Sequence, residues 1–94
     1  MMYITVRFYG LWNLYLGLDR LSLRADSLDD ILTQVEERFG SQLREKLQTR
    51  GIKMDGKIQD NSIVLLNGIN LRNLKQAKLR EGDILHIFPP ATGG

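Results

Sequence analysis

The hydrophobic residues follow a period of two over residues 3–9 and 20–24, and a helical period after Ser27. A period of two is typical of a half-buried strand, whose side chains point alternately to the two faces of a sheet. Residues 10–19 form the connection between these strands, so we expect the strands to pair as a hairpin. The change of period at Ser27 then predicts a helix that follows the hairpin.

Ser27 is typical of a helix N-cap, and Asp30 three residues later is a weaker variant of the capping box. We expect this main helix to end at Gly40. A shorter second helix is expected over residues 41–50, with Gly51 as its stop. The apolar side chains that share one face of the main helix are Leu28, Ile31, Leu32, Val35 and Phe39.

The second half of the chain contains signals for further strands. Residues 52–61 are polar and predict a connection with room for a short strand. Residues 63–66 are a short apolar run, and residues 67–68, Asn-Gly, are a strong signal for a two-residue hairpin turn. Residues 69–71 would return from this turn.

Residues 84–88 predict the final strand, with Leu85 and Ile87 facing the helix. The side chains expected on its outer face are Ile84, His86 and Phe88. If the first and last strands are neighbours at the centre of the sheet, they must run parallel. The element order therefore predicts an α+β fold of the β-grasp (ubiquitin-like) type, a mixed sheet with one main helix packed across it.

The sequence closes with Pro-Pro-Ala-Thr-Gly-Gly over residues 89–94. The two prolines fix φ and remove two backbone donors, so we expect a β-grasp domain over residues 1–88 and an extended, flexible tail after it. Gly93 and Gly94 bury no side chain but suit a peptide that threads through a narrow channel. The tail would bring the carboxylate of Gly94 to a reactive centre in another protein. A frayed end is the alternative interpretation.

Composition narrows the function classes. Ninety-four residues make one domain. The absence of cysteine excludes a disulfide framework, a thiolate metal site and a cysteine nucleophile, and agrees with a reducing cytoplasm. No signal peptide and no apolar stretch of membrane-spanning length are present, so we expect a cytoplasmic protein without a membrane partner.

The net charge of +2 is unevenly distributed, because residues 41–94 carry nine basic and five acidic side chains. A cluster before the last strand could steer a partner with an acidic surface. Its members are Arg72, Lys75, Lys78 and Arg80. Nucleic acid is not expected as a partner, since the basic residues are not interleaved with stacking aromatic residues. A solvated face is the other interpretation.

Three stretches carry a family resemblance. They are Val-Arg-Phe-Tyr-Gly-Leu at residues 6–11, Leu-Asn-Gly at residues 66–68, and the run from residue 79 to residue 94. The chain resembles the ubiquitin-like sulfur carriers of the MoaD/ThiS type, which include the small subunit of molybdopterin synthase and related small protein modifiers. Glu81 departs from the family's Asp-Gly-Asp turn, and residues 41–62 match least.

The resemblance implies a chemical role for the tail. An E1-like adenylating enzyme would activate Gly94 with MgATP, and a sulfur donor protein would convert the acyl-adenylate to a thiocarboxylate. The large subunit of molybdopterin synthase would then use this sulfur in molybdenum or tungsten cofactor biosynthesis. The chain itself would bind no cofactor and would be a cosubstrate or small subunit, not a stand-alone enzyme.

The resemblance also implies a partner-binding surface. Tyr9 and Phe88 match positions of an exposed apolar contact, and Leu71 is a looser match because the hairpin differs in length. The tail residues that would enter the partner are Pro89, Pro90, Ala91 and Thr92, followed by Gly93 and the reactive Gly94. Tyr9 and Phe88 could instead be aromatic residues at the edge of the core.

Other residue types give weaker signals. His86 is the sole histidine, and without a second histidine or a cysteine we expect no metal site. Trp12 and Tyr15 are expected to pack, not to bind a cofactor.

Several functions remain open at this point. A ubiquitin-like modifier would join Gly94 to a lysine of a target protein. A carrier for thiazole synthesis is less expected, because such chains tend to be shorter and lack the Phe-Pro-Pro stretch. A non-covalent β-grasp binding module would use its sheet face and leave the tail inert. No arrangement of nucleophile and base that would make the chain an enzyme is recognisable.

Overall fold

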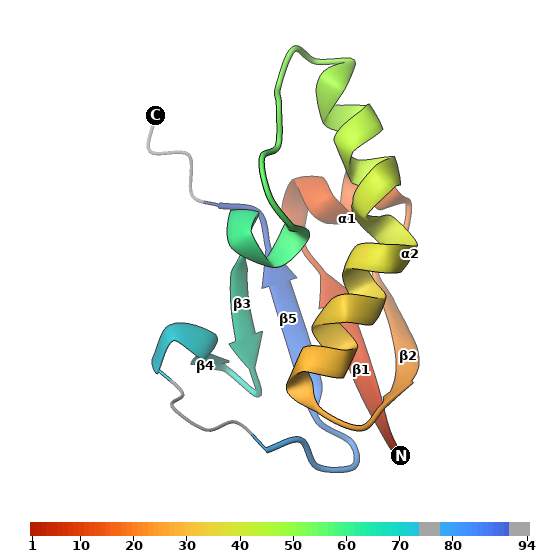
Figure 1. Cartoon of the computed structure of the whole chain (residues 1–94), viewed down its shortest axis with the longest axis vertical. Coiled ribbons are helices and arrows are strands. Elements are labelled where there is room, and N and C mark those ends of the chain that lie inside the picture. Colours follow the sequence, from red (N-terminus) through yellow and green to blue (C-terminus); the bar gives the residue numbers. More distant parts are fainter. Residues whose placement is uncertain (74–77, 91–94) are drawn as a thin grey trace.

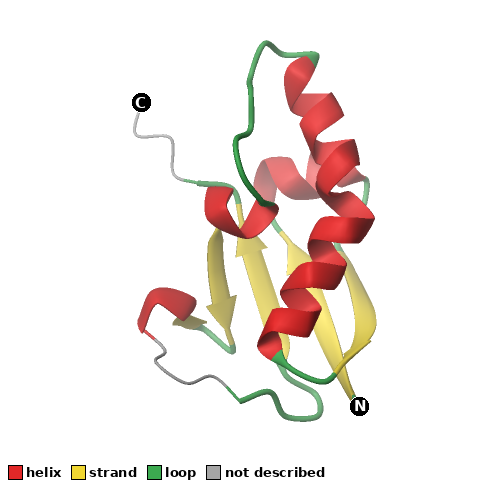
Figure 2. Cartoon of the chain, viewed as in Figure 1, coloured by secondary structure: helices red, strands yellow, loops and turns green. Residues whose placement is uncertain are grey.

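The computed structural model describes residues 1–73 and 78–90. In this part of the chain, five strands form one mixed sheet in the order β2-β1-β5-β3-β4, and the long helix α2 crosses one face of it (Figure 1; Figure 2). The strands are β1 (Met2–Phe8), β2 (Arg20–Ala25), β3 (Ile63–Leu66), β4 (Ile69–Asn70) and β5 (Ile84–Phe88). The helices are α1 (Gly10–Leu16), α2 (Leu28–Gln48) and two short 3-10 helices, η1 (Ile58–Asn61) and η2 (Leu71–Asn73).

The strand pairing confirms the predicted β-grasp fold. β1 and β2 form the expected antiparallel hairpin, with Ile4 opposite Leu23. β1 and β5 lie side by side in parallel, with Val6 opposite Leu85. β3 pairs with β5 on its other edge, in antiparallel orientation. β5, the last strand in the sequence, is therefore central and is hydrogen-bonded to a neighbouring strand on each edge.

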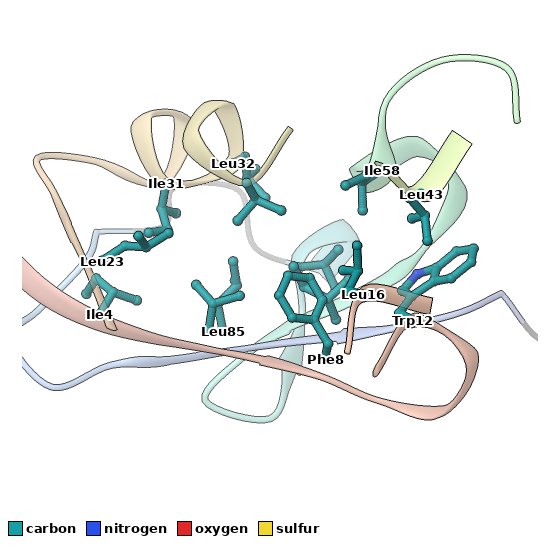
Figure 3. Packing of buried hydrophobic residues seen from close by; sticks show 14 of the residues in the cluster. Ile4, Phe8, Trp12, Leu16, Leu23, Ile31, Leu32, Leu43, Ile58 and Leu85 are labelled. Atoms are coloured by element: carbon teal, nitrogen blue, oxygen red, sulfur yellow. The ribbon is translucent and has the colours of Figure 1, made fainter. Parts of the chain in front are cut away.

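The hydrophobic core lies between the sheet and α2 (Figure 3). Leu85 and Ile87 of β5 are 0% and 1% exposed, so the predicted inward face of the final strand is confirmed. Phe8 of β1 packs edge-on against Phe39 of α2, with 5.3 Å between the ring centroids. Because alternate residues of each strand enter this core, the remaining ones are left on the open face of the sheet.

The connection between the first two strands contains a helix that the sequence analysis did not predict. α1 spans Gly10–Leu16 and buries Trp12, Tyr15 and Leu16 in the core. The indole Nε1 of Trp12 donates to Ser62 Oγ at 2.8 Å, which satisfies the buried donor. Trp12 and Tyr15 therefore pack in the core as predicted. They are three residues apart, which places them on the same face of α1.

α2 is a single helix of 21 residues, so the prediction of two helices separated at Gly40 is wrong. Its start is as predicted, because Ser27 Oγ accepts a hydrogen bond from Asp30 N at 3.1 Å. Leu43 and Leu47 face the core, and the helix ends before Gly51, which has a φ of +75°.

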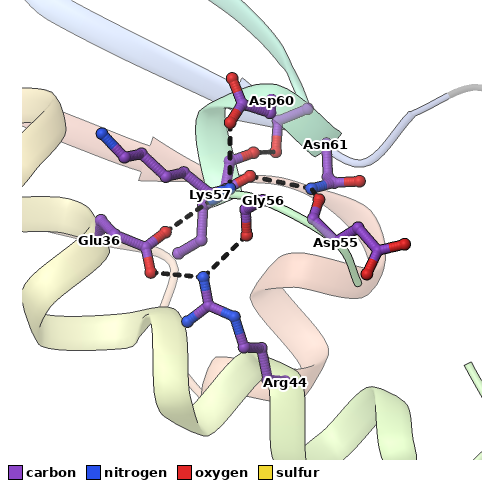
Figure 4. A network of polar contacts seen from close by, with 9 residues as sticks. Glu36, Arg44, Asp55, Gly56, Lys57, Asp60 and Asn61 are labelled. Carbon is purple, nitrogen blue, oxygen red and sulfur yellow. Dashed lines mark hydrogen bonds and ion pairs between the residues drawn. The ribbon is translucent and has the colours of Figure 1, made fainter. Parts of the chain in front are cut away.

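Gly40 leaves space for two side chains that cross the surface of the helix. A salt bridge of 2.7 Å between Glu36 and Arg44 lies across this position, and a Cβ at Gly40 would overlap the Glu36 carboxylate and come within 2.7 Å of Arg44 Nη1 (Figure 4). Glu36 also accepts from Ile58 N at 2.7 Å, and Arg44 donates to Gly56 O at 2.8 Å. The glycine therefore makes room for a network that attaches the following connection to α2.

That connection differs from the prediction in one respect. Residues 52–61 contain the 3-10 helix η1 and no strand. The predicted hairpin that follows is confirmed, with β3 and β4 joined at Asn67 and Gly68, which have φ values of +51° and +93°. Asn67 also receives a hydrogen bond from Ile84 N at 2.9 Å, which fixes the turn to the start of β5.

We predict that Gly40→Ala destabilises the protein, although glycine to alanine in a helix normally stabilises by about 1 kcal/mol. The new Cβ must move the ends of the Glu36 and Arg44 side chains, and we expect the loss of their bonds to residues 56 and 58 to cost about 1–3 kcal/mol. Urea denaturation would measure the free energy of unfolding.

The control repeats this substitution in a chain that already carries Glu36→Ala and Arg44→Ala. There the new methyl group meets no ion pair, and Gly40→Ala should stabilise. Equal effects of Gly40→Ala in both backgrounds would show that the network is not what requires the glycine.

Candidate functional site

Two aromatic side chains meet on the open face of the sheet, where the first and last strands end. Tyr9 directly follows β1, and its N–H donates to Ile87 O at 3.1 Å, which extends the parallel pairing by one residue. The rings of Tyr9 and Phe88 stack, with 4.2 Å between centroids and 13° between planes. Both residues are half-buried. The structure thus brings together two of the three predicted contact residues of the domain.

His86 and Arg7 border this aromatic stack. Tyr9 Oη lies 2.6 Å from His86 Nδ1, and the Arg7 guanidinium carbon lies 5.1 Å from the centroid of the Tyr9 ring. Partial burial, and secondly the positive charge of Arg7, lower the pKa of His86 below its ordinary value of 6.5. His86 is therefore mainly neutral at pH 7, and a neutral imidazole nitrogen can accept the hydrogen bond of the Tyr9 hydroxyl.

Leu71, the third predicted contact residue, lies away from the Tyr9–Phe88 stack. It is half-buried on the helix side of the sheet, where it packs against the hydrophobic core. Together with Leu32 and Val64 it lines an open groove of about 520 Å³. The structure does not bring Leu71 to the Tyr9–Phe88 stack, and its role in partner binding stays a prediction.

The root of the tail is packed against the start of α1. Pro89 follows Phe88 and is half-buried, whereas Pro90 is exposed. Two features favour glycine at position 10. A Cβ there would lie 3.2 Å from Pro89 Cγ, which is a tight contact, and the φ of +56° is in the left-handed region that favours glycine. The predicted roles of Ala91, Thr92, Gly93 and Gly94 fall on residues 91–94, which lie outside the described residues, as does Lys75.

Neither a metal centre nor a membrane span is found in the described chain. Within residues 1–73 and 78–90, no three His, Asp or Glu side chains gather as metal ligands. None of the helices described there is both long and apolar enough to cross a membrane.

Comparison with known proteins identifies the family. The model of the ThiS family matches residues 18–94, most of the chain and all of its C-terminal part. The chain belongs to the ThiS family. A comparison with curated protein sequences gives no match.

Solved structures share the fold of this ThiS-family protein. Small archaeal modifier protein 1 from Methanosarcina acetivorans has a TM-score of 0.72 at 23% identity, over 100% of this chain and 98% of that one. The HVO 2177 protein of Haloferax volcanii has a TM-score of 0.67 at 28% identity, over 99% and 87%. Subunits 1 and 2 of molybdopterin-converting factor from Helicobacter pylori 26695 form a complex in which the matched chain has a TM-score of 0.55 at 24% identity, over 99% and 100%.

Sequence reasoning missed two arginines of this ThiS-family chain. Arg7 of β1 and Arg20 of β2 stand directly opposite each other, so both side chains emerge on one face of the sheet. Tyr9 and Phe88 lie on the same open face. The alternation of side chains along the strand predicts that Arg7 points outward. Its position opposite Arg20 depends on the register of the hairpin, which the alternation does not give.

We predict that the protonation of His86 makes the folded protein less stable in mild acid. Because the folded-state pKa is lowered, the unfolded chain binds this proton more readily, and the free energy of unfolding falls as the pH drops below about 6.5. The contribution is fully present above that pH. His86→Gln should flatten this part of the profile, since glutamine does not titrate and its carbonyl can still accept from Tyr9.

Thermal melting of both proteins between about pH 5 and 8 tests this expectation. Carboxylates titrate equally in both chains, so the difference between the two curves reports His86. Parallel curves over the whole range would contradict the lowered pKa.

Proposed function

We propose that this protein is a sulfur carrier whose Gly94 carboxylate is adenylated and converted to a thiocarboxylate, which donates sulfur for molybdopterin biosynthesis. The observation that carries the proposal is the ThiS-family match, which extends through residue 94 and so includes the Pro-Pro and Gly-Gly of the tail. These reactions would take place in the cytoplasm.

The chemistry explains why a tail is the working part. A carboxylate is a poor electrophile at neutral pH, so it must first attack the α-phosphorus of ATP, which forms the acyl-adenylate and releases pyrophosphate. Hydrosulfide supplied by a donor protein then attacks the acyl carbon, and AMP leaves, so the thiocarboxylate forms without a change of oxidation state. The small protein supplies the carboxylate and its position, whereas the adenylating enzyme binds MgATP and stabilises the phosphoryl charge. The chain is therefore a cosubstrate and needs no cofactor of its own.

The fold supports presentation of such a tail. Residues 89–94 follow the central strand β5, and Pro89 is held beside Gly10. The Tyr9–Phe88 stack lies immediately before this root, so a protein that takes up the tail meets the stack at the same time. Half-buried aromatic residues on an otherwise unpartnered sheet face are typical of protein interfaces. The likeness to a chain of the Helicobacter complex of subunits 1 and 2 supports a synthase large subunit as the partner.

A ubiquitin-like modifier is the second candidate. The likeness to small archaeal modifier protein 1 favours it, since that chain is covered almost completely. In this case, the activated Gly94 would be attacked by a lysine amine of a target protein, with AMP as the leaving group and an isopeptide bond as the product. Both candidates share the adenylation step and differ in the nucleophile.

The decisive test is intact-mass analysis after incubation with the adenylating enzyme from the same genome, MgATP and a sulfide source. A sulfur carrier should gain the mass of one oxygen-to-sulfur exchange, located at Gly94 by fragmentation. Removal of Gly93 and Gly94 should abolish the product and leave the melting temperature almost unchanged. Isopeptide-linked conjugates in cells would favour the modifier, and no product with any activating enzyme would contradict both.

A second prediction concerns the aromatic stack. Phe88→Ala should weaken binding of the synthase large subunit by about tenfold or more, because a central aromatic contact is lost. The matched control is Tyr3→Ala on β1, an aromatic residue that is 55% exposed and away from the tail. Titration calorimetry on both variants measures the effect, and equal affinities would exclude the stack from the interface.

A further inference from the structure

The open face of the sheet carries three arginines on the β1–β2 hairpin. Arg7 and Arg20 face each other across the β1–β2 hairpin, and Arg24 stands opposite Tyr3 in the same pairing. The outward positions of β1, β2, β3 and β5 are otherwise aromatic, apolar, hydroxyl or imidazole side chains, with no carboxylate on the strands themselves. This half of the open face is therefore positively charged.

The Arg7–Arg20 pair is unfavourable for the isolated protein. Like charges directly opposite each other in antiparallel strands destabilise the pairing. The nearest carboxylate is that of Asp19, 3.8 Å from Arg7 Nη2 and itself more than half exposed, and such a pair contributes little. The buried Nε of Arg7 has no hydrogen-bond acceptor within the part of the chain that the structure describes. The folded protein thus places two arginines opposite each other and leaves the Nε donor of Arg7 without an acceptor among the described residues.

The guanidinium of Arg7 is also fixed in direction. It lies over the ring of Tyr9, which in turn stacks on Phe88. The Tyr9 hydroxyl is engaged with His86. The guanidinium of Arg7 is thereby held in place beside the Tyr9–Phe88 stack. A ligand that binds it would therefore lose little free energy to the ordering of side chains.

We propose that Arg7 and Arg20 form a carboxylate-binding site for an acidic side chain of the protein partner that docks on the open sheet face. A glutamate or aspartate there would accept bonds from the exposed ends of both guanidinium groups and relieve the cross-strand repulsion. An apolar residue next to it would cover the Tyr9–Phe88 stack. The inference rests on the proposed function only for the identity of the partner, because the site itself does not involve the tail.

Both an acidic protein and a nucleic acid would match the positive charge, and the arrangement of the aromatic rings favours the acidic protein. A nucleic-acid surface would need an aromatic ring with a free face for stacking. The ring of Tyr9 is already stacked on Phe88, with 4.2 Å between the ring centroids, and the guanidinium carbon of Arg7 lies 5.1 Å from its centroid. An acidic side chain needs no free ring, only the guanidinium edges.

The first experiment uses a short synthetic peptide that alternates glutamate with leucine, and a neutral counterpart with glutamine. Titrated into ¹⁵N-labelled protein, the acidic peptide should shift the Nε–Hε signals of Arg7 and Arg20, and high salt should reverse the shift. The glutamine peptide should leave these signals unchanged. Equal shifts with both peptides, or shifts confined to other residues, would overturn the site. A stronger response to a single-stranded oligonucleotide would assign the face to nucleic acid instead.

The second experiment measures docking of the purified synthase large subunit and adenylating enzyme. Arg7→Gln combined with Arg20→Gln should weaken the binding of at least one of them by about tenfold or more, while the melting temperature stays equal or rises. The charge-matched control, Arg38→Gln with Lys46→Gln, changes exposed residues of α2. An affinity that falls equally in both variants, or in neither, would overturn the site.

Failure of the inference and failure of the proposed function give different results. A thiocarboxylate that forms normally on the double arginine variant, with unaltered partner affinity, would refute the carboxylate site and leave the sulfur carrier intact. Acidic peptide binding at Arg7 and Arg20 without any thiocarboxylate would refute the carrier and leave the site intact.

Discussion

The parallel pairing of β1 and β5 is the interaction on which the rest of the structure depends. Val6 lies opposite Leu85 and Phe8 opposite Ile87, and all four side chains are almost fully buried beneath α2. The same pairing continues to Tyr9, so burial on one face of the sheet fixes which residues meet on the other. The aromatic stack and the root of the tail are consequences of a core that forms between the two ends of the chain.

Much of this fold follows from local patterns. The alternation of residues 3–9 and 20–24, the Ser27 cap and the Asn67–Gly68 turn each depend on neighbours in the sequence, and each prediction is confirmed. One error concerns a distant contact, and the other a short local segment. A glycine such as Gly40 usually ends a helix, and its true role depends on a salt bridge tied to residues 56 and 58. α1 was missed because Gly10 and Gly17 bracket a segment too short for its helical spacing to stand out.

The candidate site was predictable to a similar extent. Tyr9 and Phe88 were found through family resemblance, and the structure shows them in contact. Leu71 could not be placed, because β4 is only two residues long and η2 turns the chain toward the helix side. The proximity of Arg7 to Arg20 is a matter of strand register, which side-chain alternation does not determine. The charge pattern of the open face therefore became visible only when the strands were paired.

The position of β5 has a mechanical consequence. A force applied to the chain beyond Phe88 would act on this strand along its axis, from the end next to Pro89. Because β5 is bonded to β1 on one edge and to β3 on the other, the load is shared by two ladders in shear, and neither can open one bond at a time. A force applied at Pro89 would therefore have to break both ladders together before β5 could leave the sheet.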